Sequence, residues 1–280
     1  MEESFLELHD INLNLPNSKK TLFYNLNLEL SNKLSIIGVL GSNGSGKTIL
    51  AKMLSGLVKI KSGQIKIFNT NITRYKTTKR LNYISMSFQM INMSFIRHTV
   101  KDEIDYNQNL LIKRKKQLIN SKEIQQIQPK LFSEKEMQHP LTLSGGEKRK
   151  LSFYLLKESD PKCYILDEPT VGLDYYGVQE LKKDILELKN QNKKIIIITH
   201  NLQFLLSLTD EVIILHKDTV SQISSILYQG SLTSYLLNNK NEANQFLSIP
   251  LEFEIYRDKL ETGEISQGLK YENFLQSNSN

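Results

Sequence analysis

A glycine-rich octapeptide carries the clearest chemical signal in the chain: Gly41-Ser42-Asn43-Gly44-Ser45-Gly46-Lys47-Thr48. It fits the pattern G-x-x-x-x-G-K-S/T, in which glycines let the backbone turn its N–H groups inward as a cradle for phosphate oxygens. The amine of Lys47 would reach the β- and γ-phosphates, and the hydroxyl of Thr48 would bind Mg²⁺. A plain glycine-rich turn is the alternative. An apolar run over 34–40 and a helical pattern over 47–57 flank the loop, however, and this context predicts a nucleotide-binding site.

Two adjacent carboxylates, Asp167 and Glu168, end the apolar run 164–166. Because side chains alternate along a strand, the two acids point to different places and can take different roles. Asp167 suits a position on Mg²⁺, directly or in the second shell of ligands. Glu168 suits the general base that orients and deprotonates an attacking water.

A histidine, His200, follows the apolar run 195–198 and Thr199. A lone histidine at the end of a strand is often structural. The carboxyl ends of parallel strands are nevertheless where ligands bind, so His200 is expected on the same rim as Asp167. There it would hydrogen-bond the γ-phosphate or the water, which favours hydrolysis over binding alone.

The segment Leu143-Ser144-Gly145-Gly146-Glu147 predicts a helix start. Ser144 is a good N-cap, and the glycines permit close backbone approach to a ligand. An ordinary helix start explains the serine. It does not explain why a second helix end suited to anions occurs in one chain.

The elements that must position these residues follow from hydrophobic periodicity. Residues 6–15 and 26–30 alternate apolar and polar side chains, as in an antiparallel β-layer with a turn at Pro16-Asn17-Ser18. Strand patterns at 34–40, 163–166, 194–199 and 211–215 alternate with helical ones, of which 178–188 is the clearest. This alternation predicts an α/β fold with a parallel sheet.

The rest of the chain has a different texture. The polar, Lys- and Gln-rich segment that begins at Gln89 predicts an inserted helical subdomain over about 89–155. Patterning weakens after residue 218, and 276–280 is expected to be a frayed tail.

Composition bounds the class of protein. With 39% hydrophobic and 24% charged residues among 280, and no apolar run near the roughly 20 needed to cross a bilayer, the chain is expected in the cytosol. The acidic start, 1–7, lacks a signal-peptide pattern. A single cysteine, Cys163, excludes an internal disulfide and is expected to be buried. The net charge of +6 is scattered, which favours solvated faces over direct nucleic-acid binding.

These motifs together resemble the ATP-binding-cassette (ABC) family, in the family's order. A glutamine loop at Phe88-Gln89 and a D-loop at Gly172-Leu173-Asp174 complete the set. The resemblance covers roughly residues 5–220. It implies a RecA-like P-loop NTPase core over 1–220, with 221–280 forming a short C-terminal helical extension and tail.

The family's mechanism follows from the same resemblance. Two cassettes would pack head to tail, so that Ser144, Gly145 and Gly146 of one cap the γ-phosphate of ATP held by the other. Gln89 would contact Mg²⁺ or the water, and Asp174 would lie across the seam. The partners implied are a second ATPase subunit, identical or different, and transmembrane transporter subunits. These would hold the chain peripherally at the cytoplasmic face of the membrane.

Within the family, the chain looks most like the ATPases of energy-coupling-factor importers, which take up vitamins and metal ions. The matching positions are Phe95, Thr99-Val100, Asp102-Glu103, Ile104 and the late segment 249–260.

The chain also departs from the family pattern. Leu15 and Pro16 stand where an aromatic residue usually stacks on adenine, and Phe23 or Tyr24 could substitute. Met90-Ile91-Asn92 replaces a more polar stretch, and Glu147 replaces a commoner glutamine.

Two other functions are compatible with a cassette. A soluble ABC ATPase acting on nucleic acid or the ribosome would usually carry a long coiled coil or a second cassette, and this chain shows neither. A weakly hydrolysing, regulatory subunit is disfavoured by the intact Glu168, His200 and Ser144. The sequence does not identify the cargo.

Overall fold

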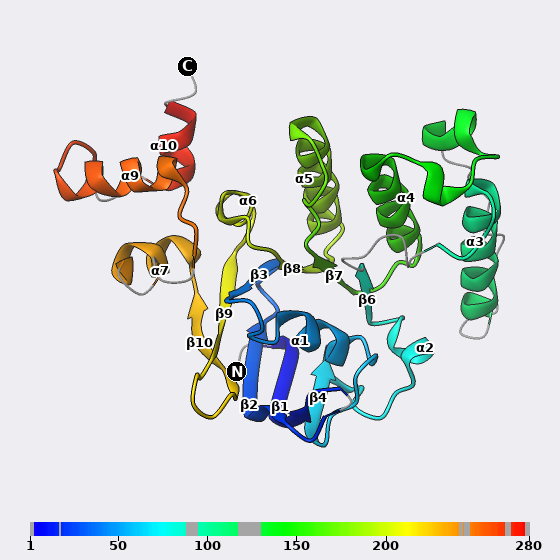
Figure 1. Cartoon of the computed structure of the whole chain (residues 1–280), viewed down its shortest axis with the longest axis horizontal. Coiled ribbons are helices and arrows are strands. Elements are labelled where there is room, and N and C mark those ends of the chain that lie inside the picture. The colour runs from blue at the N-terminus through cyan, green and yellow to red at the C-terminus, as the bar shows by residue number, and fades with distance from the viewer. Residues whose placement is uncertain are drawn as a thin grey trace.

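The computed structural model describes residues 3–16, 18–87, 95–116, 130–240, 243, 247–266 and 270–277. Over these residues ten strands form one curved sheet in the order β5-β4-β1-β2-β10-β9-β3-β8-β7-β6. The fold is the α/β P-loop architecture predicted, with an antiparallel layer, a parallel core, an inserted group of helices and C-terminal helices (Figure 1).

The antiparallel layer is made by the first long strands. β1 (Ser4–Asn14) pairs with β2 (Thr21–Ser31) and with β4 (Ser62–Ile67), to which the short β5 (Thr70–Asn71) is added. Leu6, Leu8 and Leu28 point into the core, as their alternation predicts. The predicted turn at Pro16 joins the two long strands, where the Leu15 N–H donates to the Lys20 carbonyl at 2.8 Å.

The parallel part of the sheet brings distant segments together. β3 (Ile36–Gly41) lies between β8 (Lys194–Ile198) and β9 (Glu211–Lys217), and β7 (Cys163–Asp167) lies between β8 and β6 (Ile84–Ser87). All five strands run in the same direction. The residues of β3, β7 and β8 are all buried, which explains the largely continuous apolar sequences of these strands.

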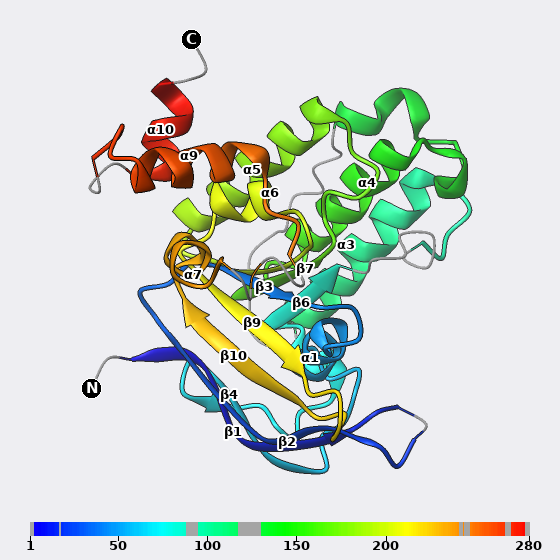
Figure 2. The same cartoon turned by 60° about the vertical axis from the view of Figure 1, so that its left-hand side comes forward.

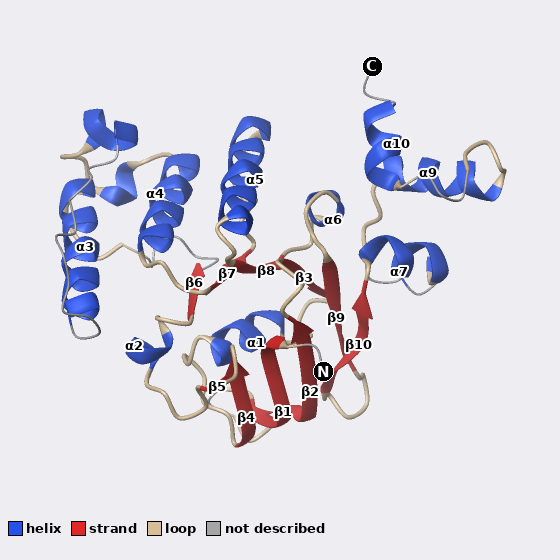
Figure 3. Cartoon of the chain, turned by 180° about the vertical axis from the view of Figure 1, so that it is seen from behind, coloured by secondary structure: helices blue, strands red, loops and turns tan. Residues whose placement is uncertain are grey.

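Alternate residues of these strands feed two cores. Ile196 and Ile198 pack toward α1 (Lys47–Leu54) and the antiparallel layer, whereas Ile195 and Ile197 pack toward the helices on the other face. Those helices include α5 (Tyr175–Asn190), α6 (Leu202–Leu206) and α7 (Leu232–Asn238). Helix α1 therefore lies inside the curve of the sheet (Figure 3).

A buried arginine fixes the far end of α1. The helix ends before Gly56, whose φ of 79° is the left-handed conformation typical of a residue just past a helix end. Arg80, in α2 (Thr77–Arg80), donates to the carbonyls of Met53 at 2.8 Å and Leu54 at 3.1 Å. A cation at this end also complements the helix dipole. The C-terminal end of the helix that begins at the phosphate loop is thus fixed by Arg80.

The inserted helices form a small core of their own. α3 (Val100–Lys116) and α4 (Gly145–Glu158) pack side by side, with two 3₁₀ turns at Lys130–Lys135 and Pro140–Thr142 between them. Val100, Ile104 and Leu151 are buried in this group. Figure 1 places α3 and α4 at the opposite side of the molecule from the C-terminal helices.

The described residues beyond 218 form more regular secondary structure than their weak periodicity predicts. β10 (Ser224–Gly230) pairs along β9 and contacts β2, so it links the parallel and antiparallel parts of the sheet (Figure 2). Helices α9 (Leu251–Glu261) and α10 (Tyr271–Ser277) follow and pack through an aromatic cluster. In that cluster the rings of Phe253 and Tyr271 lie 5.0 Å apart.

Composition led to two further expectations, one about the single cysteine and one about helices that could cross a membrane. Cys163 is fully buried, as predicted, and burial raises the pKa of its thiol to about 12. None of the helices in the described part of the chain has the length and apolar character that crossing a bilayer requires.

Candidate nucleotide site

The three chemical motifs meet at one edge of the parallel sheet. β3, β8 and β7 are neighbours in that order, and each continues from its carboxyl end into a functional segment. These segments are the phosphate loop after Gly41, the acid pair at Asp167 and Glu168, and Thr199 with His200. Ligands bind at this edge of open α/β sheets. The topology therefore gathers residues that lie more than 150 positions apart in the chain.

The phosphate loop has the backbone shape that its glycines allow. Gly41, Gly44 and Gly46 have φ values of 141°, 80° and 97°, which only glycine adopts readily. A Cβ on Gly46 would lie 3.0 Å from the ring of Phe23, so the loop also rests directly on the core. Helix α1 then begins without a side-chain cap. Its first N–H groups and the dipole of the helix remain available for an anion.

Lys47 is held inside this loop. Its ammonium donates to the carbonyls of Gly41 at 2.7 Å and Ser42 at 3.0 Å. Burial lowers the pKa of Lys47, although the negative charges of Glu168 and Asp167 act in the opposite direction. A partly desolvated cation beside uncapped N–H groups attracts phosphate strongly.

Asp167 is buried and only partly satisfied. It accepts a hydrogen bond from the side chain of Thr48, and its Oδ2 has no hydrogen-bond partner. Burial raises the pKa of Asp167, and this effect exceeds the opposing influence of Thr48 and of the nearby lysines. An orphaned carboxylate oxygen next to a threonine hydroxyl is the oxygen donor set that Mg²⁺ prefers. These two residues fit the metal.

Glu168 is fixed in a strained but well-supported position. Its φ of 48° lies in the left-handed region, which a non-glycine residue enters at a cost. Its N–H donates to the carbonyl of Ile198 at 2.8 Å, and its Oε2 accepts from the hydroxyl of Thr199 at 2.8 Å. His200 Nε2 lies 3.7 Å from Glu168 Oε1, and half of its side chain is exposed. The carboxylate can thus hold a water at its Oε1 side.

The segment Leu143–Glu147 does begin a helix, α4. Ser144 accepts a hydrogen bond from the Glu147 N–H at 3.3 Å, and Glu147 accepts one from the Ser144 N–H at 3.0 Å, which is a capping box. Lys135 also pairs with Glu147. These hydrogen bonds and the ion pair lower the pKa of Glu147 to about 2. Ser144 and Gly145 face solvent.

The D-loop lies beside this helix start in the same chain. A Cβ on Gly145 would be 3.9 Å from the Gly172 carbonyl. Asp174 is the N-cap of α5, and its Oδ1 accepts from the Gly177 N–H at 2.7 Å. Asp174 therefore has a structural role within the chain, and it is also exposed. The exposed start of α4 and the exposed D-loop thus meet at Gly145 and Gly172.

Some residues of the site were predicted and others were not. Gln89 lies outside the described residues. Thr199 and Ser87 were missed: Thr199 positions Glu168, and Ser87 Oγ accepts from the Asp167 N–H at 3.2 Å. Thr199 stands next to His200 at a strand end, so its place in the chain was a usable signal. Ser87 carried none.

The two aromatic candidates for adenine differ in exposure. Phe23 is fully buried against Gly46 and offers no free ring face to a base. Tyr24 is 69% exposed. Of the two, only Tyr24 stays a candidate.

Comparison with known proteins gives a consistent result. The family model for ABC transporters matches residues 23–171. The chain is 35% identical over 196 residues to a Pyrococcus furiosus protein described as an ABC transporter ATP-binding protein, covering 69% of this chain and 74% of that protein. A Bacillus cereus protein of the same description is 31% identical over 222 residues. The alignment covers 78% of this chain but 38% of that relative, so the chain spans less than half of the longer protein.

Solved structures share the fold at lower identity. CbiO1 of Clostridium perfringens, part of the ABC transporter complex CbiONQ, superposes with a TM-score of 0.65 at 21% identity, covering 91% of this chain and 99% of that chain. The dimeric ATP-binding cassette MJ0796, bound to ADP and phosphate, superposes with a TM-score of 0.64 at 18% identity, covering 81% and 98% respectively.

Proposed function

Because this chain belongs to the ABC transporter family and is an ATPase of that family, we propose that it is the engine of a transporter and works as one half of a head-to-tail pair. One observation carries the proposal. The phosphate loop, Asp167, Glu168 and His200 converge at one sheet edge, while the Ser144 helix end of the same chain faces solvent. Such a chain has a site for ATP and, at the start of α4, an exposed surface that a second chain could contact.

The loop from Gly41 to Thr48 would bind the ATP phosphates through its N–H groups, with Lys47 turning from the loop carbonyls to the β- and γ-phosphates. Thr48, Asp167 and Gln89 would hold Mg²⁺. When bound, this ion neutralises charge on the phosphate oxygens. The cradle geometry and the unpartnered Asp167 oxygen support this assignment.

Hydrolysis would depend on Glu168. Its Oε2 is occupied by the Thr199 hydroxyl, which leaves Oε1 to accept the proton of the attacking water. His200, 3.7 Å from that oxygen, would donate a hydrogen bond to the water or the γ-phosphate. Lys47 would stabilise the charge that develops on the phosphate.

The second half of each site would come from a neighbour. Ser144, Gly145 and Gly146 at the start of α4 would bind the γ-phosphate of ATP held by the partner, and Asp174 would lie at the seam. Their exposure, and the dimeric form of the neighbour MJ0796, support this arrangement. Loss of the γ-phosphate would remove the bridge and open the pair.

We further propose an energy-coupling-factor importer for vitamins or metal ions as the subtype. The likeness to CbiO1, a component of CbiONQ, and the C-terminal helix α9 at the expected position support it. Transmembrane subunits would then hold the chain at the cytoplasmic face of the membrane, without direct nucleic-acid binding.

The proposed division of the chain is a cassette over 1–220 with a helical subdomain at about 89–155, followed by the extension 221–280. Because β10 joins the main sheet, we would place the end of the cassette after Gly230.

The function is tested by purifying the tagged full-length chain from gently solubilised native membranes. We expect integral membrane proteins to co-elute, and a second ATPase subunit if the pair is mixed. ATP hydrolysis by this complex should exceed that of a matched Glu168→Gln preparation. Co-elution with ribosomes or nucleic acid, and with no membrane protein, would contradict the proposal.

A further inference from the structure

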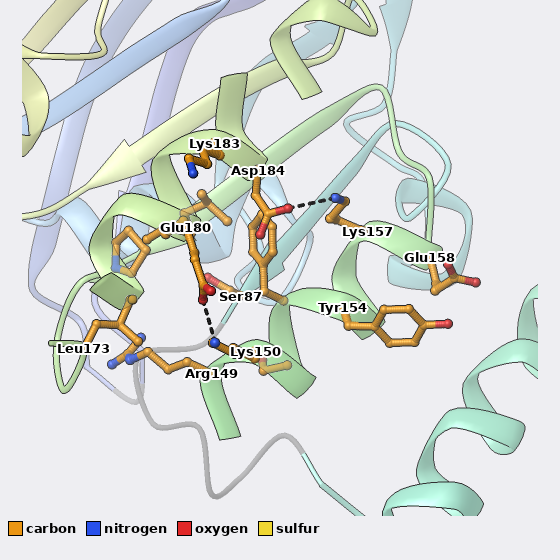
Figure 4. Close-up of a pocket in the computed structure, with 16 residues that line it drawn as sticks. Ser87, Arg149, Lys150, Tyr154, Lys157, Glu158, Leu173, Glu180, Lys183 and Asp184 are labelled. Atoms are coloured by element: carbon orange, nitrogen blue, oxygen red, sulfur yellow. Dashed lines mark hydrogen bonds and ion pairs between the residues drawn. The ribbon is translucent and has the colours of Figure 1, made fainter. Parts of the chain in front are cut away.

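A cavity of about 570 Å³ lies between α4 and α5 (Figure 4). Its volume is within the range of small-molecule sites. The lining is mainly apolar and includes Phe153, Leu166, Pro169, Leu173 and Leu181. Leu166 and Pro169 flank the two acids directly, and α4 and α5 begin at the Ser144 and Asp174 caps. The cavity is thus separate from the phosphate loop, and its lining includes Leu173 of the D-loop and the two residues that flank the acid pair.

Two ion pairs between residues that line this cavity join α4 to α5. Lys150 of α4 pairs with Glu180 of α5 at 2.5 Å, and Lys157 pairs with Asp184 at 3.0 Å. A helix is about 10 Å wide, so it could not pass beneath these pairs without breaking both. A single apolar chain or a small ring system could. The occupant suited to the cavity is therefore a small molecule.

Two cations that line the cavity, Arg149 and the exposed Lys183, have no ion pair with another described residue, and Arg149 is the less exposed of the two. Arg149 is half-buried and has no hydrogen bond or ion pair with any residue in the described part of the chain. Burial lowers its pKa, and among charged groups only Glu168 offsets this loss. A partly desolvated guanidinium gains most from a carboxylate or a similar anion. Figure 4 shows the Arg149 side chain next to Leu173.

We propose that this cavity binds a small amphipathic anion, with its apolar body on Phe153, Leu166 and Leu181 and its acid group paired with Arg149. The ligand class is that of medium-chain carboxylates. The site lies outside the nucleotide-binding residues, so its occupancy does not depend on the transport function proposed above.

The chain contains no tryptophan, which allows a direct test. The Phe153→Trp variant places a single fluorophore in the cavity wall, where the free volume can accept the larger ring. Titration with decanoate should shift its emission and saturate. Decanol, which has the same chain without the charge, should bind at least ~10-fold more weakly, the scale of one charge-assisted hydrogen bond. A Val220→Trp reporter, 90% exposed in the turn between β9 and β10, should not respond.

The role of the arginine is isolated by matched variants in the reporter background. Arg149→Gln should weaken decanoate to the level of decanol and leave decanol unchanged. Lys148→Gln, its neighbour on α4 outside the cavity lining, should bind decanoate as before. Calorimetric titration of the wild-type chain and of Arg149→Gln repeats the test without a reporter. The proposal is wrong if decanoate and decanol bind equally, if Arg149→Gln changes nothing, or if only an amphipathic peptide binds.

Discussion

The rim of the parallel sheet and the start of α4 handle their polar groups in opposite ways. On the rim, Lys47, Asp167 and Glu168 are 8%, 1% and 9% exposed, and each contacts another polar group of the site. At the start of α4, Ser144 and Gly145 face solvent, and the cap is closed locally by Glu147. Both regions contain the start of a helix, where backbone N–H groups can bind an anion. Only the rim, however, has proposed catalytic residues of the same chain beside the start of its helix, α1.

This difference in exposure predicts that the rim acts on ATP within one chain, whereas the start of α4 acts when two chains assemble. Buried charges on the rim interact strongly because water is partly excluded, so substitutions there should change chemistry within one chain. Substitutions at the exposed start of α4 should leave a single chain intact and act only when two chains meet.

The largest expected effect comes from replacing Glu168, the proposed general base on the rim. Glu168→Gln keeps the shape of the side chain and its acceptor for Thr199, but it cannot take a proton from water. We expect hydrolysis to fall by ~10² or more, with ATP binding retained. Phosphate release and nucleotide binding, measured on the same preparation, distinguish a loss of hydrolysis from a loss of ATP binding. Wild-type turnover in this variant would remove Glu168 from its role.

A smaller effect is expected from the residue that positions this base. Thr199→Val removes the hydroxyl that donates to Glu168 at 2.8 Å. Losing one hydrogen bond to a charged group should lower kcat by ~10-fold or more. KM should change little, because the Thr199 hydroxyl donates to Glu168 and would act on ATP only through it. Thr199→Ser, which keeps the hydroxyl, is the control. If serine fails to restore kcat, packing rather than the hydrogen bond is responsible.

Burial of the Asp167 carboxylate predicts that this residue lowers the stability of the folded chain. Its pKa is raised mainly by burial, so the folded chain binds a proton more tightly than the unfolded one. Asp167→Asn should therefore raise Tm by a few degrees at neutral pH in the absence of nucleotide and metal. The gain should shrink as the pH falls through the raised pKa, where Asp167 becomes neutral.

Thermal unfolding scans across pH test this, with Asp174→Asn as the matched control. Asparagine caps helices as well as aspartate does, so the control should change Tm little. An Asp167→Asn variant that is less stable at neutral pH would show that Lys47 and Thr48 outweigh the burial of the carboxylate.

The smallest effect belongs to the exposed cap. Glu147→Gln keeps the acceptor for the Ser144 N–H but loses the ion pair with Lys135, and exposed pairs contribute at most ~1 kcal/mol. The pKa of Glu147 is lowered from 4.5 to about 2, so its stabilisation is complete above 4.5 and is lost as the pH falls toward 2. The variant should lack this acid-dependent loss in denaturant titrations. A loss much above this size would mean that Lys135 and Glu147 hold the subdomain together.

Much of this arrangement could be predicted because the relevant signals are local. The phosphate loop, the acid pair and His200 each follow an apolar run, and parallel strands place such segments on one edge. β10 was missed because only one of its seven residues is fully buried, so its sequence lacks the apolar run of a buried strand. Its place is set by pairing with β9 and β2. Similarly, Ser87 reaches Asp167 only through the pairing of β6 with β7.

The composite site itself is tested most directly by mixing two inactive variants. Ser144→Arg should block the start of α4 while leaving ATP binding to its own loop intact, and Glu168→Gln lacks the base. In a mixed pair, one of the two sites would combine an intact loop with an intact Ser144 from the other chain. We predict that mixing restores ATP hydrolysis that neither variant shows alone. No recovery in mixed pairs whose formation is verified, or loss of ATP binding by the isolated Ser144→Arg chain, would contradict the account.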